Sequence, residues 1–385
     1  MRQICFIITS HIHYSRSKLV LEAIRWRKDL KLQIAVAASA ILPQYGDVLT
    51  AMERDGYRAD ARIIMTLAGG NPVAMAKTTG IGVTEFATAF DNLRPDVVVV
   101  RGDRYEVLAA AIAASYMNIP VAHIEGGDVT GSIDESVRHA VTKLAHIHLV
   151  THDLASRRVV QMGENPAYVF NVGCPELEYI EKHAATITSD AINRYGVGDP
   201  LDLEKPFLMV MHHPVTTEES NRDHTTLLLE VINDSGMQTL WFWPNVDAGT
   251  DDVAKAIRVF RENRHPHHIR FAKYVLPDEY MALLKKCACF VGNSSAGIKE
   301  ASFLGIPVVN VGSRQQFRLR GPNVIDADYE REEIRRAIGK QIAQGRYEPS
   351  TIYYKKDCGK HIAELLATIP LYTQKRFFTL NNVQG

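Results

Sequence analysis

The sequence predicts an α/β protein made of two doubly wound parallel sheets with a cleft between them. Short apolar runs rich in Val and Ile alternate with longer helical patterns along most of the 385 residues, which is typical of parallel strands joined by helices. The alternation is interrupted over 174–206, where charged helical sequence leads to glycines and Pro200, and it then restarts. A chain of this length is expected to divide into about two domains.

The first half contains seven apolar runs that we expect to be buried strands. An apolar helix follows Arg104, residues 9–15 are expected to form the turn after the first strand, and 67–72 a loop. The expected strands are 3–9, 32–38, 62–64, 96–100, 121–124, 147–151 and 168–172, and the other expected helices are 17–26, 46–56, 73–93 and 155–162.

The second half repeats the pattern and ends in a helix after Tyr353. Two similar halves of comparable size imply a cleft between them, which is the usual place for a small-molecule substrate. The buried strands expected here are 207–211, 239–243, 269–272, 289–292 and 307–311.

The composition is that of an ordinary globular protein and argues against several classes of partner. Apolar residues make up 46% and charged residues 23% of the chain, and 44 basic residues match 44 acidic ones, so nothing indicates binding to nucleic acid or to a membrane surface. The N-terminal apolar run is too short for a signal peptide, and no apolar stretch could span a bilayer. The five scattered cysteines lack zinc-type spacing. We expect a soluble cytoplasmic protein with reduced cysteines.

Carboxylates follow two neighbouring strands of the first half. Asp103 comes just after the strand at 96–100, and Glu125 comes directly after the strand at 121–124. Ligands of doubly wound sheets bind beyond the carboxyl ends of the strands, so both acids are expected in one crevice. Asp134 and Glu135 lie a short loop further on. This cluster indicates proton transfer at carbon.

The second half carries the features of a diphosphate site. His213 follows the first strand of that half, and a small-residue turn with Ser294 and Ser295 leads into an expected helix whose N–H groups favour phosphate. Arg314 follows the next strand and could offer a bidentate fork to the same phosphates. Glu300 lies early in the helix, within reach of a ribose hydroxyl. The pattern predicts a nucleoside diphosphate held without a metal or another cofactor.

Each signal also has a plain structural interpretation. Asp103 is common in turns, Asp134 and Glu135 could only cap a helix, His213 could be a core histidine, and 292–295 could be a helix cap. Together these interpretations require a series of coincidences at the same edge of two sheets. Weaker candidates are His139, His146 and His148, and the cluster His265, His267 and His268 is expected to be a surface loop.

Several segments together resemble one enzyme family. Residues 123–127 read His-Ile-Glu-Gly-Gly and 132–139 read Ser-Ile-Asp-Glu-Ser-Val-Arg-His, which resembles the hydrolysing UDP-N-acetylglucosamine 2-epimerases of sialic acid biosynthesis. The resemblance covers nearly the whole chain. It implies two Rossmann-like domains of the glycosyltransferase B type, with the final helix crossing back to the first domain. Supporting segments are 102–104, 213–217, 244–249, 292–297, 312–315 and 374–377.

The resemblance implies an organisation and a reaction. The domains would be 1–175 together with a C-terminal helix at about 358–385, and 176–357. A base would remove the C2 proton of a UDP-sugar while UDP leaves C1. Water would then add to the glycal and release N-acetylmannosamine. The expected assembly is a homodimer or a homotetramer, with no cofactor.

The resemblance also implies residue roles. Asp103, Glu125 and Asp134 would be acid/base residues, with Glu135 as the alternative to Asp134, and His213 would assist departure of UDP or proton transfer. Ser294, Ser295 and Arg314 would hold the diphosphate, and Glu300 the ribose. Other substrate contacts would come from His11, Ser15, Arg101, Arg104, Asn245, Gly292 and Arg318.

Two positions depart from the family pattern. His11 stands where the family has an Arg that reaches the diphosphate, and Arg101 stands where it favours His. We expect Arg101, or a protonated His11, to supply the missing cation, unless Arg101 only pairs with an acid of its own domain. The open alternatives for function are the same reaction on UDP-2,4-diacetamido-2,4,6-trideoxyglucose, a UDP-sugar glycosyltransferase and a nucleotide-sugar sensor without catalysis.

Overall fold

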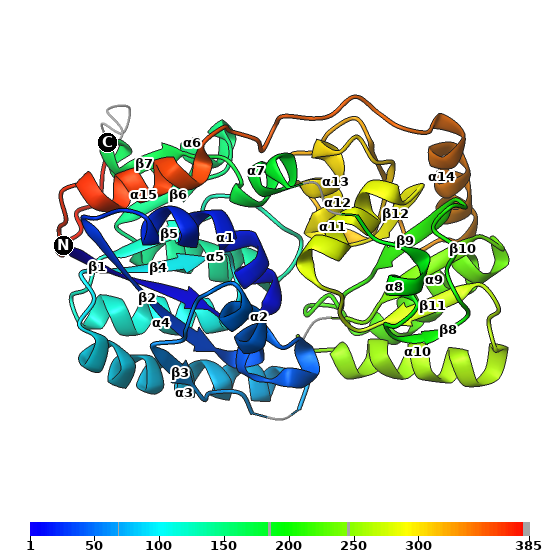
Figure 1. Ribbon diagram of the computed structural model, residues 1–385, viewed down its shortest axis with the longest axis horizontal. Helices are drawn as coiled ribbons and strands as arrows, with labels where there is room; N and C mark the ends of the chain where they lie inside the picture. Colours follow the sequence, from blue (N-terminus) through cyan, green and yellow to red (C-terminus); the bar gives the residue numbers. More distant parts are fainter. Residues whose placement is uncertain (68, 184–185, 245–246, 380–385) are drawn as a thin grey trace.

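The computed structural model describes residues 1–379 except 68, 184–185 and 245–246. Two seven-stranded sheets are present in this part of the chain, one in each lobe of Figure 1. Helices cover both faces of each sheet, as the alternating sequence predicts. We propose the domain division at 175/176 and 357/358 from this arrangement.

The first sheet is entirely parallel, in the order β3-β2-β1-β4-β5-β6-β7. Its central strands are buried on both faces: Val97 and Val99 pack in one core cluster, Val98 and Val100 in another. This two-sided burial explains the continuous β-branched runs. The strands are β1 (Arg2–Ile8), β2 (Leu30–Ala37), β3 (Ala61–Ile63), β4 (Val97–Arg101), β5 (Val121–Ile124), β6 (Ile147–Val150) and β7 (Val169–Asn171).

The helix after β1 begins earlier than predicted. Ser10 has an extended backbone and its side chain accepts a hydrogen bond from the N–H of His13, so Ser10 caps a helix that starts at His11. The prediction of a turn over 9–15 is therefore wrong from His11 onward. The helices of this half are α1 (His11–Arg25), α2 (Val48–Arg54), α3 (Pro72–Leu93), α4 (Tyr105–Tyr116), α5 (Ile133–Leu144), α6 (Asp153–Gln161) and the 3-10 turns η1 (Ala38–Ile41), η2 (Pro43–Tyr45) and η3 (Pro166–Tyr168). The next helix, α7 (Pro175–Lys182), begins at the proposed domain boundary.

The second sheet has the order β14-β13-β12-β9-β10-β11-β8 and is parallel except for the edge strand β8. The five predicted strands of this half are confirmed, and β8 and β14 were not predicted. The elements are β8 (Val197–Gly198), β9 (Phe207–Met211), β10 (Gln238–Phe242), β11 (Ile269–Ala272), β12 (Cys289–Gly292), β13 (Val308–Val311), β14 (Val324–Ala327), α8 (Ser189–Ile192), α9 (Asn221–Asp234), α10 (Thr250–Arg264), α11 (Pro277–Lys286), α12 (Ser295–Ile298), α13 (Glu300–Phe303), η4 (Ser313–Gln315) and α14 (Arg331–Gln344).

The last helix returns to the first half. Figure 1 shows the segment after α14 crossing to the first lobe, where α15 (Cys358–Thr368) lies against α1. Ile362 and Leu366 of α15 share a core cluster with Val20 and Ile24 of α1. The predicted crossing of the final helix is confirmed, but the helix ends at Thr368, so the expectation of a helix over 358–385 is wrong for 369–379.

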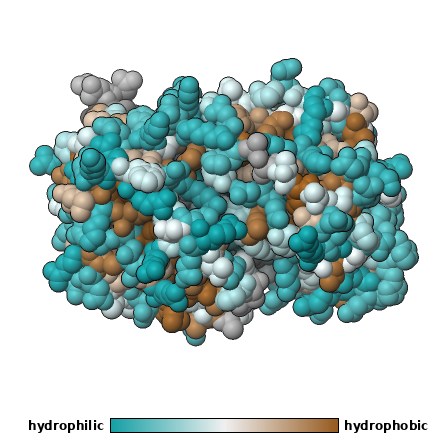
Figure 2. Space-filling view, viewed as in Figure 1, coloured by the Kyte–Doolittle hydropathy of each residue, from teal (hydrophilic) through white to brown (hydrophobic). Residues whose placement is uncertain are grey.

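The face seen in Figure 2 is mostly hydrophilic, with hydrophobic side chains scattered over it. None of the helices in the described part of the chain combines the length and apolar character needed to cross a bilayer.

Candidate active site

A cavity of about 510 Å³ lies between the carboxyl edges of the two sheets. In each sheet the strand order reverses at one point, between β1 and β4 in the first and between β9 and β12 in the second. The loops after these four strands all contribute to the cavity wall, as the rule for doubly wound sheets predicts. The cleft is therefore built from the two switch points facing each other.

The cavity brings together most of the predicted residues. Four of them, Glu135, Ser15, Gly292 and Glu300, do not line it, and Asn245 lies outside the described residues. The weaker candidates His139, His146 and His148 do not line it either. The predicted residues in the wall are Asp103, Glu125, Asp134, His213, His11, Arg101, Arg104, Ser294, Ser295, Arg314 and Arg318.

Local contacts explain why two of the four lie elsewhere. The carboxylate of Glu135 accepts a hydrogen bond from the N–H of Thr130 at 2.7 Å, and the hydroxyl of Ser15 donates to the carbonyl of Ile12 at 3.0 Å. Both side chains are thus occupied beside their own helices. Asp134, rather than Glu135, is the carboxylate that α5 presents to the cavity.

Gly292 has a structural role. Its φ is +130°, and a Cβ at this position would lie 2.2 Å from the carbonyl oxygen of Met211 on the neighbouring strand. Only glycine permits this backbone and this approach of β12 to β9.

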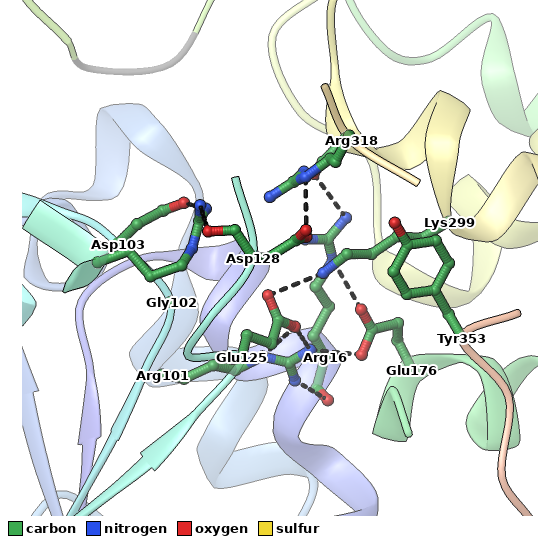
Figure 3. A network of polar contacts seen from close by, with 12 residues as sticks. Arg16, Arg101, Gly102, Asp103, Glu125, Asp128, Glu176, Lys299, Arg318 and Tyr353 are labelled. Atoms are coloured by element: carbon green, nitrogen blue, oxygen red, sulfur yellow. Dashed lines mark hydrogen bonds and ion pairs between the residues drawn. The ribbon is translucent and has the colours of Figure 1, made fainter. Parts of the chain in front are cut away.

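Glu125 is held by cations from both halves (Figure 3). Its Oε1 accepts from the Nε of Arg101 at 3.1 Å and also from Nη2, and its Oε2 accepts from the Nζ of Lys299 at 2.9 Å. Burial by itself would raise the pKa of Glu125, but Arg101, Lys299 and Arg16 together hold this pKa well below its usual value. The backbone of Glu125 has φ +70°, a strained conformation typical of functional positions. Glu125 is therefore a fixed, ionised carboxylate.

The pKa of Asp134 is shifted in the opposite direction. Burial raises its pKa despite the guanidinium of Arg314, whose Nη2 lies 3.4 Å from Oδ2. Asp103 instead forms an ion pair with Arg138 of α5. These three carboxylates of the cavity wall thus lie in three different electrostatic environments.

Arg101 is fully engaged within the protein. It is 2% exposed, pairs with Glu125 and Glu176 and donates through Nη1 to the carbonyl of Arg16. The pairing foreseen as the alternative to diphosphate binding is therefore present. Burial lowers the pKa of His11 to about 4, so a protonated His11 does not supply the cation near neutral pH either.

Arg16 is one of the cavity-lining cations that sequence reasoning missed. It extends from the second turn of α1 to the other half, where its Nε donates to Glu300 at 2.9 Å and its Nη2 to the hydroxyl of Ser295 at 3.5 Å. The pairing with Arg16 also explains why Glu300 is buried outside the cavity. The helix period is the signal that could have identified Arg16. Because α1 begins at His11, Arg16 lies on the face of this helix that meets the cleft.

The turn with Ser294 and Ser295 leads into a shorter helix than predicted. A break at Lys299 divides the expected helix into α12 and α13, each of four residues. A helix this short has a small dipole, so the groups at this turn that could hold an anion are hydroxyls and arginines rather than the dipole. The hydroxyl of Ser294 caps the N–H of Ala296 at 3.4 Å and can still donate to a ligand.

Asn293 joins three loops behind the cavity. Its side chain accepts from the N–H of His213 and donates to the carbonyl of His213, both at 2.8 Å, and its own carbonyl accepts from Arg314 at 3.2 Å. Burial and the neighbouring Arg314 lower the pKa of His213 well below its usual value. His213 is thus a neutral imidazole at neutral pH.

One group among the described residues has the donor spacing of a metal site. Ligand atoms of Glu125, Cys174 and Glu176 lie within 4.8 Å of one another, all buried. Arg101 and Lys299 already neutralise these carboxylates, and burial raises the pKa of the Cys174 thiol well above its usual value. The residues therefore do not fit a metal ion, because a cation would compete with fixed ammonium and guanidinium groups.

Comparisons with known proteins agree with this geometry. Residues 22–367 match the family model described as UDP-N-acetylglucosamine 2-epimerase. The chain is 33% identical, over 97% of its length and 98% of the relative, to UDP-N,N'-diacetylbacillosamine 2-epimerase (hydrolyzing) from Legionella pneumophila. It is 30% identical, over 99% and 100%, to UDP-N-acetylglucosamine 2-epimerase from Neisseria meningitidis.

The fold also matches solved structures. A UDP-GlcNAc 2-epimerase from Neisseria meningitidis bound to UDP-GlcNAc superposes with a TM-score of 0.75, at 16% sequence identity, over 94% of this chain and 99% of that one. The predicted glycosyltransferase B type of fold is confirmed. With a family model that covers most of its length, the chain belongs to the UDP-N-acetylglucosamine 2-epimerase family.

Proposed function

We propose that the protein is a hydrolysing 2-epimerase that converts UDP-N-acetylglucosamine and water to N-acetylmannosamine and UDP. The proposal rests on the sequence features given above and on the names of its relatives, one of which is described as hydrolyzing. It is also supported by a cavity that joins an acid cluster to a phosphate-binding turn.

One observation carries the proposal: two carboxylates of the same cavity differ in their cationic contacts, because both oxygens of Glu125 are bound by cations whereas Asp134 has one contact of 3.4 Å to Arg314. Glu125 is kept ionised, whereas Asp134 is biased toward the protonated form. Environments that separate the pKa values of neighbouring acids mark acid/base sites. A glycosyltransferase needs no such pair facing the sugar.

In the first step, UDP leaves C1 and the C2 proton is removed, which gives a glycal. We assign the proton transfer at C2 to Asp134, since its raised pKa makes it the stronger base when it is ionised. Glu125, which keeps its charge, stabilises positive charge that develops at C1 as the diphosphate departs. In the second step, water adds to C1 and releases a proton. We assign to the carboxylate of Asp103 the acceptance of this proton and its delivery to the opposite face of C2, while Asp134 loses to solvent the proton that it took in the first step.

The leaving diphosphate would be held by groups at the junction of the halves. Ser294 and Ser295 supply hydroxyl donors, and Arg16 and Arg314 supply positive charge from opposite sides. Neutral His213 can donate a hydrogen bond to the departing oxygen but carries no charge of its own.

The same reaction on UDP-2,4-diacetamido-2,4,6-trideoxyglucose is the second candidate. It is favoured by the 33% identical relative from Legionella pneumophila, described as a UDP-N,N'-diacetylbacillosamine 2-epimerase. We further propose a homodimer or homotetramer in the cytoplasm, which gel filtration with light scattering and cell fractionation would test.

Incubation with each UDP-sugar in the absence of an acceptor tests the function. We expect release of UDP together with free N-acetylmannosamine, or with the 2,4-diacetamido 2-epimer if that is the better substrate. Recovery of an epimerised UDP-sugar would indicate a non-hydrolysing enzyme. Turnover that requires an acceptor sugar would indicate a glycosyltransferase, and binding of unchanged substrate would indicate a sensor.

A further inference from the structure

Lys299 is a buried lysine that crosses the cleft. It lies at the break between α12 and α13, its side chain is 1% exposed, and its Nζ donates to Oε2 of Glu125 in the other half at 2.9 Å. Figure 3 shows the ammonium group between the carboxylate of Glu125 and the ring of Tyr353, and the distance from Nζ to the ring centre is 5.8 Å. A lysine is rarely buried this completely without a specific partner.

The two oxygens of Glu125 are held from different halves. Arg101, from the same half, binds only Oε1, and Lys299 binds Oε2. With Arg101 alone, the carboxylate could still rotate about its last side-chain bond, because one oxygen would lack a partner. Both contacts together fix its plane.

Lys299 is also tied to the phosphate-binding turn. Its backbone N–H donates to the carbonyl of Ser295 at 3.0 Å. The preceding residue, Ser294, lines the cavity. A group bound at this turn therefore controls where the backbone of Lys299 lies. The ammonium group itself already has Glu125 as its partner.

The charged groups around Glu125 lie on several elements of both halves. Three cations and three carboxylates alternate through ion pairs, so loss of one cation leaves a buried carboxylate without compensation. The titratable and charged groups that face Glu125 are Arg101 of β4, Arg16 and His13 of α1, His123 of β5, Cys174 and Glu176 at α7, Cys358 of α15, and Lys299 and Arg318 of the second half.

We propose that Lys299 is a positioning residue: it carries the second contact of Glu125 on the nucleotide-binding half, so that this carboxylate is aimed at the sugar only when the two halves are closed. The inference rests on the proposed function, because it assigns Lys299 to the reaction at the same site. It couples occupation of the phosphate-binding turn to completion of the acid cluster.

The variant Lys299→Met keeps the length of the side chain and removes its charge. We expect kcat for the nucleotide sugar to fall by about tenfold or more, while the Kd for UDP changes by less than about threefold. Lys299→Arg should restore most of kcat, and Lys205→Met, at an exposed lysine, is the matched control.

A kcat that stays near the wild-type value in Lys299→Met would overturn the inference. A loss of UDP affinity with unchanged kcat would instead make Lys299 a diphosphate ligand. A double-mutant cycle of Lys299→Met and Glu125→Gln in thermal unfolding needs no turnover. Non-additive effects support the pairing, and additive effects refute it. If the wild-type protein hydrolyses no nucleotide sugar, the proposed function fails, and the cycle still decides whether Lys299 holds Glu125.

Discussion

Single residues determine which carboxylate of the cavity keeps its charge. Glu125 is buried and Asp134 is half-buried. Two donors of Arg101 bind one oxygen of Glu125 and Lys299 binds the other, whereas Asp134 has one longer contact to Arg314. Burial favours the neutral acid and close cations favour the carboxylate, so the number and distance of the cations determine the outcome. The electrostatic difference between the two acids follows from these contacts rather than from the residue types.

Replacing Glu125 by Gln tests its role directly. The amide has nearly the same shape but carries no charge, so we expect turnover to fall by about 100- to 1000-fold, as for loss of an electrostatic stabiliser. UDP affinity should persist, because the phosphate-binding groups are unchanged. Glu135→Gln is the matched control, since Glu135 does not line the cavity, and should keep near-normal turnover. A Glu125→Gln variant with near-normal turnover would remove Glu125 from the mechanism.

Arg16 and Arg101 can be separated by their effect on nucleotide binding. Arg16→Met removes a donor beside Ser295, so we expect UDP to bind about tenfold to 100-fold more weakly in a calorimetric titration, from charge-assisted bonds of roughly 1.5–3 kcal/mol. Both substitutions leave buried carboxylates poorly compensated and should lower the unfolding temperature, but Arg101→Met should leave UDP affinity nearly unchanged. The reverse pattern would assign the diphosphate contact to Arg101.

At the scale of elements, strand positions followed from the sequence better than helix starts did. The buried strands were predictable because two-sided burial leaves continuous β-branched runs. The start of α1 was not predictable, because histidines and a tyrosine at 11–14 give a weak helical pattern. The helix cap also depends on Ser10 adopting an extended backbone. That error also concealed Arg16.

Sequence reasoning also failed to identify contacts between residues on opposite sides of the cleft. Asp103, Glu125 and Asp134 could be placed at the cavity because each follows a strand of one sheet or its adjoining loop. Lys299 and Glu176 could not, because their contacts join segments far apart in the chain and depend on how the two halves meet. The helix break at Lys299 has no marker such as Pro in the sequence.

The segment after α15 is held by a buried acid. Glu164 accepts from His148 at 3.0 Å and pairs with Lys143 and with Lys375, the latter at 2.7 Å. Burial alone would raise the pKa of Glu164, but these three partners lower it to about 2. The folded value is thus below the unfolded one, so this stability is complete above the unfolded pKa and is lost as pH falls toward about 2.

Glu164→Gln should remove this pH-dependent contribution, on the order of 2–3 kcal/mol above pH 5. We expect a lower unfolding temperature at pH 7 and a smaller further decrease than in the wild type between about pH 4.5 and 2. Calorimetry over this range measures both, with Glu348→Gln at an exposed acid as the control. Parallel curves for Glu164→Gln and the wild type would show that the carboxylate does not hold the segment.

In the whole molecule, ion pairs join the two halves across the cleft. The pairs that cross it are Glu125 with Lys299, Arg16 with Glu300, Asp128 with Arg318, Arg104 with Asp247 and Asp134 with Arg314. The chain has no net charge, and each of these pairs places a cation on one wall of the cleft and a carboxylate on the other. A diphosphate that enters must replace some of these carboxylates as partners of the arginines, so binding and closure share the same groups.

The pair of Asp128 and Arg318 allows closure to be tested away from the acid cluster. Its side chains are 2% and 4% exposed, and Nε of Arg318 lies 2.9 Å from Oδ2 of Asp128. Asp128→Asn preserves the shape but leaves the guanidinium without a counter-charge, which costs on the order of 3–5 kcal/mol for a buried pair. We therefore expect the ligand-free variant to populate an open cleft, seen as a larger radius of gyration in X-ray scattering, and UDP to restore the compact form. Asp202→Asn, in a pair on the surface of one half, should leave the radius unchanged. Equal radii for Asp128→Asn and the wild type without UDP would mean that packing, rather than these ion pairs, keeps the cleft closed.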